Sequence, residues 1–179
     1  MWRNTAASFG LVSRALHWAM ALLILALLAL GLTLSAMQPA LANLWLYELH
    51  KTMGVTAMAL VLVRLIWHRI SPPPKPLGTA SDLPQRLARA VHALIYTCLV
   101  VIPLAGWVGS SATGIDTVIF DSITLPPIAP VSEAWDAAAF VVHRATAWVL
   151  IALLGLHIAG AALRAAKCER TLARMIHGS

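Results

Sequence analysis

Charged side chains are scarce in this sequence: they make up 11% of its 179 residues, whereas 60% of the residues are hydrophobic. The hydrophobic residues fall in long blocks instead of alternating with polar ones, which excludes an ordinary soluble domain and predicts an integral membrane protein. The net charge of +6 comes from basic residues that are confined to particular connections. This charge therefore indicates orientation in a membrane and does not indicate nucleic-acid binding.

Cysteine is also rare. Cys98 falls inside an apolar segment and Cys168 in a basic tail, so we expect no disulfide between these two cysteines. Neither belongs to a C-x-x-C-H motif, which excludes covalent attachment of a c-type haem.

Four apolar segments are long enough to cross a bilayer, which requires about 20 mainly apolar residues. The first is longer than the apolar region of a secretory signal peptide, so we expect it to remain as a membrane helix. The sequence predicts an all-α, integral membrane four-helix bundle in a single transmembrane domain over residues 1–179, with helices at about 15–37, 48–68, 88–109 and 137–163.

Basic residues are missing from two of the three connections. Residues 38–47 and 110–136 contain no Lys or Arg, whereas the N-terminal segment, the second connection and the C-terminal tail are basic. Because Lys and Arg accumulate on the cytoplasmic side of membrane proteins, we expect both termini to be cytoplasmic. The third connection, with its prolines at 125–130, is expected to be a long non-helical loop that caps the outer surface.

The fourth segment carries two histidines, His143 and His157. At 100° per residue, their spacing falls about 40° short of four full turns, so both project from nearly one helix face. They lie roughly 21 Å apart along the axis, at about 1.5 Å per residue, in a hydrocarbon core about 30 Å thick. One histidine is therefore expected near each membrane surface.

Ionisable side chains inside membrane helices are costly and usually functional. By depth, His50 and His143 form an outer layer, and His17, His92 and His157 form an inner layer. Two axial histidines per iron make a b-type haem site without covalent attachment, whereas no tetrahedral zinc set is visible at either depth. Depth leaves open which two of the three inner histidines would bind the haem iron. A lone histidine in a membrane helix is often only hydrogen-bonded to a neighbouring helix. Small residues near these histidines would let a flat macrocycle approach: Gly54, Gly155 and Gly160.

Eight short motifs occur in order along the chain: His17-Trp18, His50-Lys51-x-x-Gly54, Val63-Arg64-Leu65, Pro72-Pro73-Pro74, His92-Ala-Leu-Ile-Tyr96, Pro103-Leu-Ala-Gly-Trp107, Leu125-Pro-Pro127 and Leu156-His157. With these motifs, nearly the whole sequence resembles the bacterial cytochrome b561 family. The resemblance implies a four-helix, di-haem b protein of the bacterial inner membrane that exchanges electrons with the quinone pool. In one branch of the family, superoxide is oxidised at the periplasmic face and ubiquinone is reduced.

The resemblance also implies the ligand pairs. It pairs His50 with His143 at the outer haem and His17 with His157 at the inner haem. The choice of His17 over His92 comes from the family and not from depth.

The residues around the two ends suggest where substrates react. Lys51 and Arg144 directly follow the outer ligands, and they would either steer superoxide to the haem edge or pair with haem propionates. Family members often carry a histidine pair after the fourth helix, where this chain has Arg164-Ala165. The candidates for a quinone site at the inner end are His92, Arg14, Lys75 and Arg164.

Three functions of different classes follow. The first is a superoxide:ubiquinone oxidoreductase, and the second is a cytochrome b membrane-anchor subunit that passes electrons between a partner dehydrogenase and the quinone pool. The third is a non-redox bundle such as a small transporter. The expected partners are the lipid bilayer, the quinone pool, and superoxide or a redox partner protein, with no nucleic acid.

Overall fold

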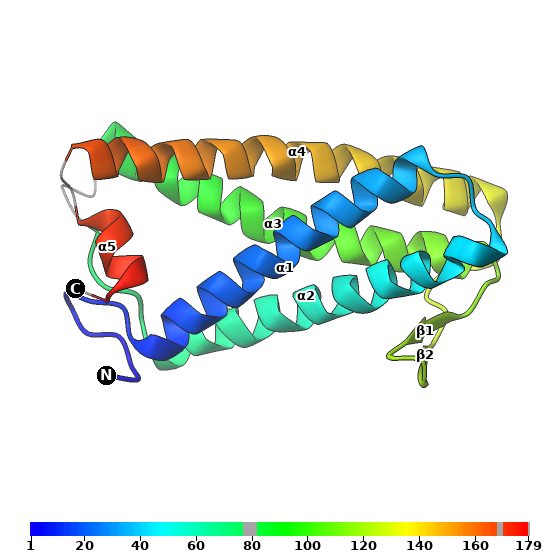
Figure 1. The fold of residues 1–179 in the computed structure, drawn as a ribbon, viewed down its shortest axis with the longest axis horizontal. Coiled ribbons are helices and arrows are strands. Elements are labelled where there is room, and N and C mark those ends of the chain that lie inside the picture. Colours follow the sequence, from blue (N-terminus) through cyan, green and yellow to red (C-terminus); the bar gives the residue numbers. More distant parts are fainter. Residues whose placement is uncertain (77–81, 168–169, 179) are drawn as a thin grey trace.

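The structure, a computed structural model, describes residues 1–76, 82–167 and 170–178. Four long helices run the length of the molecule in alternating directions (Figure 1): α1 (Leu11–Ala36), α2 (Leu44–Ile70), α3 (Leu83–Ala112) and α4 (Glu133–Ala166). Each is long and apolar enough to cross a membrane. The predicted all-α membrane bundle with four spanning helices is therefore confirmed.

Both chain termini lie at one end of the bundle, together with the short helix α5 (Thr171–Ile176) (Figure 1). A two-stranded antiparallel hairpin, β1 (Thr117–Ile119) and β2 (Ile123–Leu125), lies at the opposite end. We call these the terminal end and the hairpin end. A 3₁₀ turn at Leu41–Asn43 leads into α2 at the hairpin end.

The helices begin earlier than predicted. α1 begins at residue 11 against an expected 15, and α3 at 83 against 88. A helix rises about 1.5 Å per residue, so 34 residues of α4 exceed the hydrocarbon core of about 30 Å. The extra turns extend into the interfacial region, where polar residues are tolerated and hydropathy no longer marks the end of a helix. At the start of α4, the Ser132 side chain accepts a hydrogen bond from the backbone N–H of Trp135.

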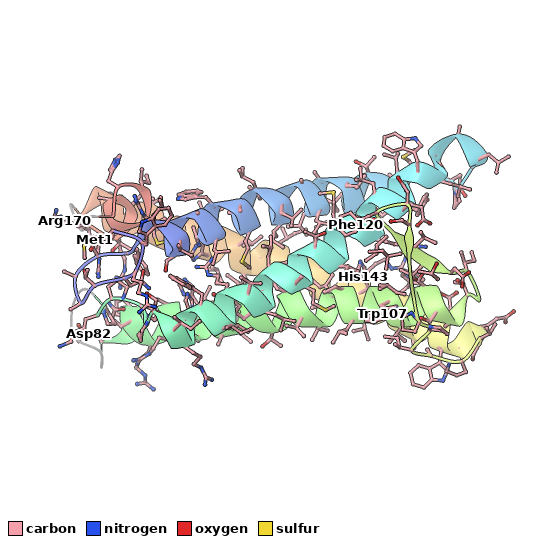
Figure 2. All side chains as sticks on the ribbon, turned by 90° about the horizontal axis from the view of Figure 1, so that it is seen from below. Met1, Asp82, Trp107, Phe120, His143 and Arg170 are labelled. Atoms are coloured by element: carbon pink, nitrogen blue, oxygen red, sulfur yellow. The ribbon has the colours of Figure 1, made fainter. Side chains whose placement is uncertain are left out.

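Within the third connection, predicted to be non-helical, residues 117–125 form the hairpin, which the sequence did not predict. Its turn places Phe120 and Asp121 at φ of 52° and 53°, in the left-handed region that turns of this kind use. The Phe120 N–H donates to Thr52 Oγ1 of α2 at 3.3 Å, and Trp107 Nε1 donates to the Pro126 carbonyl at 3.1 Å. These bonds hold the hairpin beside α2, near the end of the bundle that contains His143 (Figure 2).

An apolar cluster fills the middle of the bundle. All four long helices contribute to it, with Met20, Ile24, Ala57, Val61, Cys98, Leu99, Leu150 and Leu153. On α4 these residues lie between positions 143 and 157, so the cluster separates the two depths at which the histidines occur. Cys98 is a free, buried thiol, and Cys168 lies outside the described residues.

The outer surface of the bundle is as apolar as its interior. Large side chains such as Leu22, Trp148 and Ile158 are 67%, 62% and 58% exposed. Such surface is stable only against lipid. The protein is thus a multi-pass membrane protein whose first partner is the bilayer.

Candidate functional site

Two pairs of histidines face each other across the bundle, and both involve α4. At the hairpin end, the rings of His50 on α2 and His143 on α4 have centroids 6.1 Å apart. At the terminal end, the rings of His17 on α1 and His157 on α4 are 6.3 Å apart. His92 on α3 lies edge-on to His157 at 4.9 Å.

These separations test whether the residues fit a metal cofactor. Two imidazoles on opposite sides of one metal ion have ring centres ~6 Å apart, since each metal–nitrogen bond is ~2 Å and each ring centre lies ~1 Å beyond its nitrogen. The two separations near 6 Å fit this requirement. The 4.9 Å between His92 and His157 is too short for it. In the described part of the chain, no three His, Cys, Asp or Glu side chains gather as a zinc site would need.

The backbone leaves room between the helices that carry these pairs. Close backbone contacts join α3 to α4, α1 to α2 and α2 to α3, whereas α4 makes few or none with α1 and α2 among the described residues. The histidine pairs therefore bridge α4 to helices whose backbones it does not approach. A cofactor placed between the paired rings would lie in this wider space.

Glycines shape the same region. A Cβ atom added to Gly31 would lie 3.2 Å from Cε1 of His50, and one added to Gly106 would lie 3.2 Å from Nδ1 of His143. Larger residues there would displace the rings. A Cβ atom on half-buried Gly54 would instead meet no described atom within 4 Å, which leaves open space one turn from His50. A Cβ atom on Gly155 or Gly160, both exposed on α4, would likewise meet no described atom within 4 Å.

The ring nitrogens of the paired histidines have different partners. His143 Nδ1 donates to the carbonyl of Ile102 at 2.8 Å, which leaves Nε2 unprotonated and able to bind a metal. Ile102 directly precedes Pro103, the proline inside α3. His50 Nδ1 is buried without a hydrogen-bond partner in the described residues. The outer pair therefore suits axial ligation with little rearrangement.

A half-buried cation, Arg64, lies beside the inner pair. Arg64 Nη1 on α2 lies 3.1 Å from His17 Nδ1, and a guanidinium only donates, so this nitrogen accepts. Because Nδ1 accepts, the proton of a neutral His17 lies on Nε2. A metal at His17 Nε2 would require this Nε2 proton to leave or Arg64 to move. Arg64 Nε has no hydrogen-bond partner among the described residues. No described carboxylate pairs with this guanidinium, although it lies inside a spanning helix.

The predicted superoxide-side residues occupy different environments. The Lys51 amine lies 3.2 Å from a carboxylate oxygen of Glu48, and its side chain is 22% exposed. Arg144 is exposed on α4, one residue after His143. The Glu48 carboxylate thus offsets part of the positive charge that the sequence places at the hairpin end.

The predicted quinone-side residues do not gather in one place. His92 is exposed, and its Nδ1 donates to the Ala88 carbonyl at 2.6 Å. Arg14 Nη1 donates to the Ile176 carbonyl at 2.7 Å, which ties it to the C-terminal segment. Lys75 borders a cavity formed with α5. Arg164 is half-buried on α4 and has an interaction partner.

Several residues beside the histidines were not predicted from the sequence to belong to the site. Gly31 and Gly106 touch histidines that are distant in sequence, and no local pattern distinguishes them from packing glycines. Arg64 could have been predicted, because it lies four residues inside the predicted second helix, and an arginine within a spanning helix is costly unless it has a partner. The helix α5 is too short for periodicity to predict.

Comparison with known proteins identifies the bundle. The family model of prokaryotic cytochrome b561 matches residues 8–178. The chain is similar to cytochrome b561 homolog 2 of Escherichia coli (strain K12), with 31% identity over 157 residues that cover 86% of this chain and 82% of that protein. The match to the family model extends over all four spanning helices and both histidine pairs. The chain belongs to the prokaryotic cytochrome b561 family, whose members bind b-type haem and transfer electrons within the membrane.

Proposed function

We propose that this protein binds two b haems, one between His50 and His143 and one between His17 and His157, and passes electrons from superoxide to ubiquinone. The observation that carries the proposal is the pair of ring separations, 6.1 and 6.3 Å, on one shared helix. When bound, haem b supplies one-electron chemistry through ferric and ferrous iron. His50 with His143 and His17 with His157 would hold the two haems, which would supply electron transfer without substrate binding to the metal.

The chain's own residues provide the environment for this chemistry. The Ile102 carbonyl fixes the orientation of His143, and glycines at 31 and 106 leave room for the rings. The apolar cluster around Val61 and Leu150 excludes water between the two histidine layers. Arg64 is available to neutralise an anionic substituent of the inner haem, since no described carboxylate pairs with its guanidinium.

We place the hairpin end at the periplasm and the terminal end at the cytoplasm of a bacterial inner membrane. The support is the alternation of basic residues, which are absent from both hairpin-end connections, 38–47 and 110–136. Superoxide would then arrive at the hairpin end and ubiquinone would react at the terminal end. His92, exposed beside His157, is the best-placed proton donor for a reduced quinone, because a histidine side chain can act as a general acid. Arg164 lies two turns after His157 on the same face of α4.

The first test is the haem content of the detergent-purified protein. We expect a reduced-minus-oxidised spectrum of b type and a stoichiometry of two haems per chain. Addition of superoxide should then reduce the haems, and ubiquinone should reoxidise them. A haem-free protein would overturn the proposal. Two haems that respond only to a co-purified dehydrogenase would favour the membrane-anchor function instead.

Arg144 should carry most of the attraction for superoxide, because Glu48 already offsets Lys51. We expect Arg144→Gln to slow haem reduction by superoxide by roughly threefold to tenfold at low salt, and less at high salt, as loss of electrostatic steering requires. Stopped-flow measurement at two ionic strengths checks this. Lys51→Gln is the matched control, with a smaller expected effect. Equal rates for Arg144→Gln and wild type, with both haems present, would exclude steering by this residue.

His92 should matter for the quinone and not for haem retention. We expect His92→Ala to keep both haems and to slow ubiquinone reduction by about 10²-fold, the range of a lost proton donor. The rate of haem reduction by superoxide is the internal control, since it should not change. If ubiquinone reduction is unaltered, the proton comes from another group, and Arg164→Gln becomes the next variant to test.

A further inference from the structure

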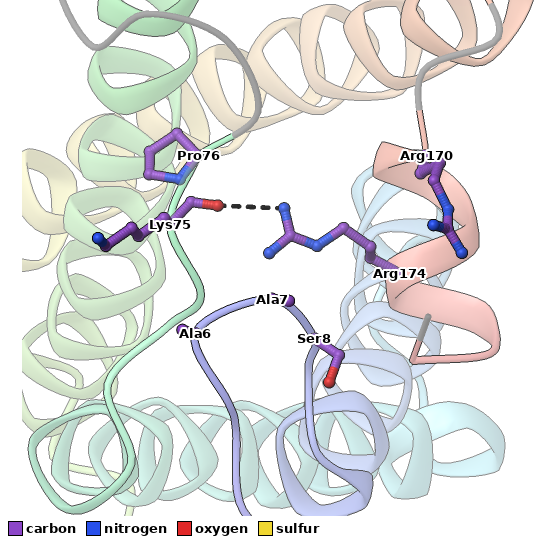
Figure 3. Close-up of a pocket in the computed structure, with 7 residues that line it drawn as sticks. All are labelled: Ala6, Ala7, Ser8, Lys75, Pro76, Arg170 and Arg174. Carbon is purple, nitrogen blue, oxygen red and sulfur yellow. Dashed lines mark hydrogen bonds between the residues drawn. The ribbon is translucent and has the colours of Figure 1, made fainter.

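A second feature of the terminal end is unrelated to the histidines. The N-terminal segment, the end of the second connection and α5 enclose an open cavity of about 420 Å³ (Figure 3). Three cations border it, Lys75, Arg170 and Arg174, together with the hydroxyl-bearing Ser8. None of the described residues that line it is acidic. The volume lies within the range of small-molecule sites, about 300–1,000 Å³.

Arg174 is the most enclosed of these cations, with 7% of its surface exposed. Its Nη1 donates to the Lys75 carbonyl at 3.1 Å across the opening of the cavity (Figure 3), and its guanidinium lies 5.7 Å from the centre of the Phe9 ring. Its Nε has no hydrogen-bond partner among the described residues. Burial lowers the pKa of Arg174, and the charge of Arg170 lowers it further. A buried guanidinium without a carboxylate is costly unless an anion accompanies it.

The walls of the cavity are fixed by long-range hydrogen bonds. The Lys75 N–H donates to the Ala6 carbonyl at 3.2 Å, and Asn4 Nδ2 donates to the Ser71 carbonyl at 2.8 Å. Trp18 Nε1 donates to the Met175 carbonyl at 3.1 Å and so anchors α5 to α1. These bonds join segments more than 60 residues apart in sequence. The cavity is therefore a built part of the fold.

We propose that this cavity binds a phosphate group, with Arg174 as the central donor and Lys75, Arg170 and Ser8 around it. Arginine suits phosphate because its planar fork donates parallel, charge-assisted hydrogen bonds. The cavity lies where the bundle ends, at the depth of lipid headgroups, and basic pockets at such positions hold anionic phospholipids. Free phosphate has the same chemistry, so the test separates the two sources.

The test uses a variant that leaves Arg174 and its structural bonds in place. Lys75→Gln/Arg170→Gln removes two exposed charges from the cavity rim. Arg69→Gln/Lys167→Gln is the matched control, since both residues are exposed at the terminal end and neither lines the cavity. The probes are phosphatidylglycerol in mixed micelles and inorganic phosphate alone. Binding is read by native mass spectrometry and by the shift in unfolding temperature.

We expect the rim variant to bind phosphatidylglycerol at least about tenfold more weakly than wild type, since each surface cation contributes about 1 kcal/mol to such binding. The control should bind as wild type does. If only phosphatidylglycerol binds, the occupant is a lipid headgroup; if inorganic phosphate binds and is lost in the rim variant, it is a free phosphate. The proposal is overturned if neither probe binds, or if the rim and control variants weaken binding equally. Arg174→Gln should abolish binding wherever that variant remains folded.

Discussion

Replacing His50 by alanine should remove the outer haem and leave the inner one, and replacing His17 should do the reverse. Each change deletes one of the two axial ligands of its site. The pairs lie at opposite ends of the bundle, separated by the apolar cluster, so the loss should stay local. We expect haem content to fall from two per chain to about one in both variants, with a different reduction potential remaining in each. Pyridine haemochrome assay and redox titration measure these changes.

His92→Ala is the matched control, because its ring lies against His157 without the separation that axial ligation requires. It should retain two haems. Loss of the inner haem from His92→Ala together with its retention in His17→Ala would show that His92, and not His17, is the inner ligand. His143→Ala and His157→Ala should repeat the outer and inner losses from the α4 side.

Replacing Arg64 by methionine should lower the reduction potential of the inner haem. A positive charge next to the haem favours the ferrous state, which carries one positive charge fewer, so its removal favours the ferric state. Arg64 Nη1 contacts His17 at 3.1 Å. A unit charge several ångströms from the iron in a medium of effective dielectric about 20 shifts the potential by roughly 50–100 mV. A redox titration that resolves the two haems measures the shift.

Two comparisons make this result specific. Arg64→Lys keeps the charge and should stay close to wild type, whereas Arg69→Gln removes an exposed charge that solvent screens and should change the potential little. The potential of the outer haem should not move in any of the three variants. An unchanged inner potential in Arg64→Met would mean that an anion already neutralises the guanidinium completely.

The sequence predicts the four helices because hydropathy over about 20 residues is a direct measure of lipid solubility. The depth of each histidine also follows, since the helical rise converts residue number into height. Rotation is harder to predict. In α1, lipid-facing Leu22 and Leu25 are as apolar as the buried Met20 and Ile24, so no polar face tells which side points inward.

Contacts that depend on the rotation of each helix about its axis therefore could not be predicted from the sequence. Gly31 meets His50, and Ile102 accepts from His143, only once all four helices are oriented about their axes. Depth could not choose between His17 and His92 either. The ring separations favour His17 in the proposed assignment, because 6.3 Å fits a metal between the rings and 4.9 Å does not.

The pattern of helix contacts has a consequence for how the protein is made. The close backbone contacts join each helix to the next one in the chain, so each can form as soon as that neighbour enters the membrane. The histidine pairs instead join α4 to α1 and α2. Neither pair exists until the last helix has been inserted, so an unfinished chain holds single histidines only. With the haem ligands proposed above, synthesis itself would delay cofactor capture until the bundle is complete.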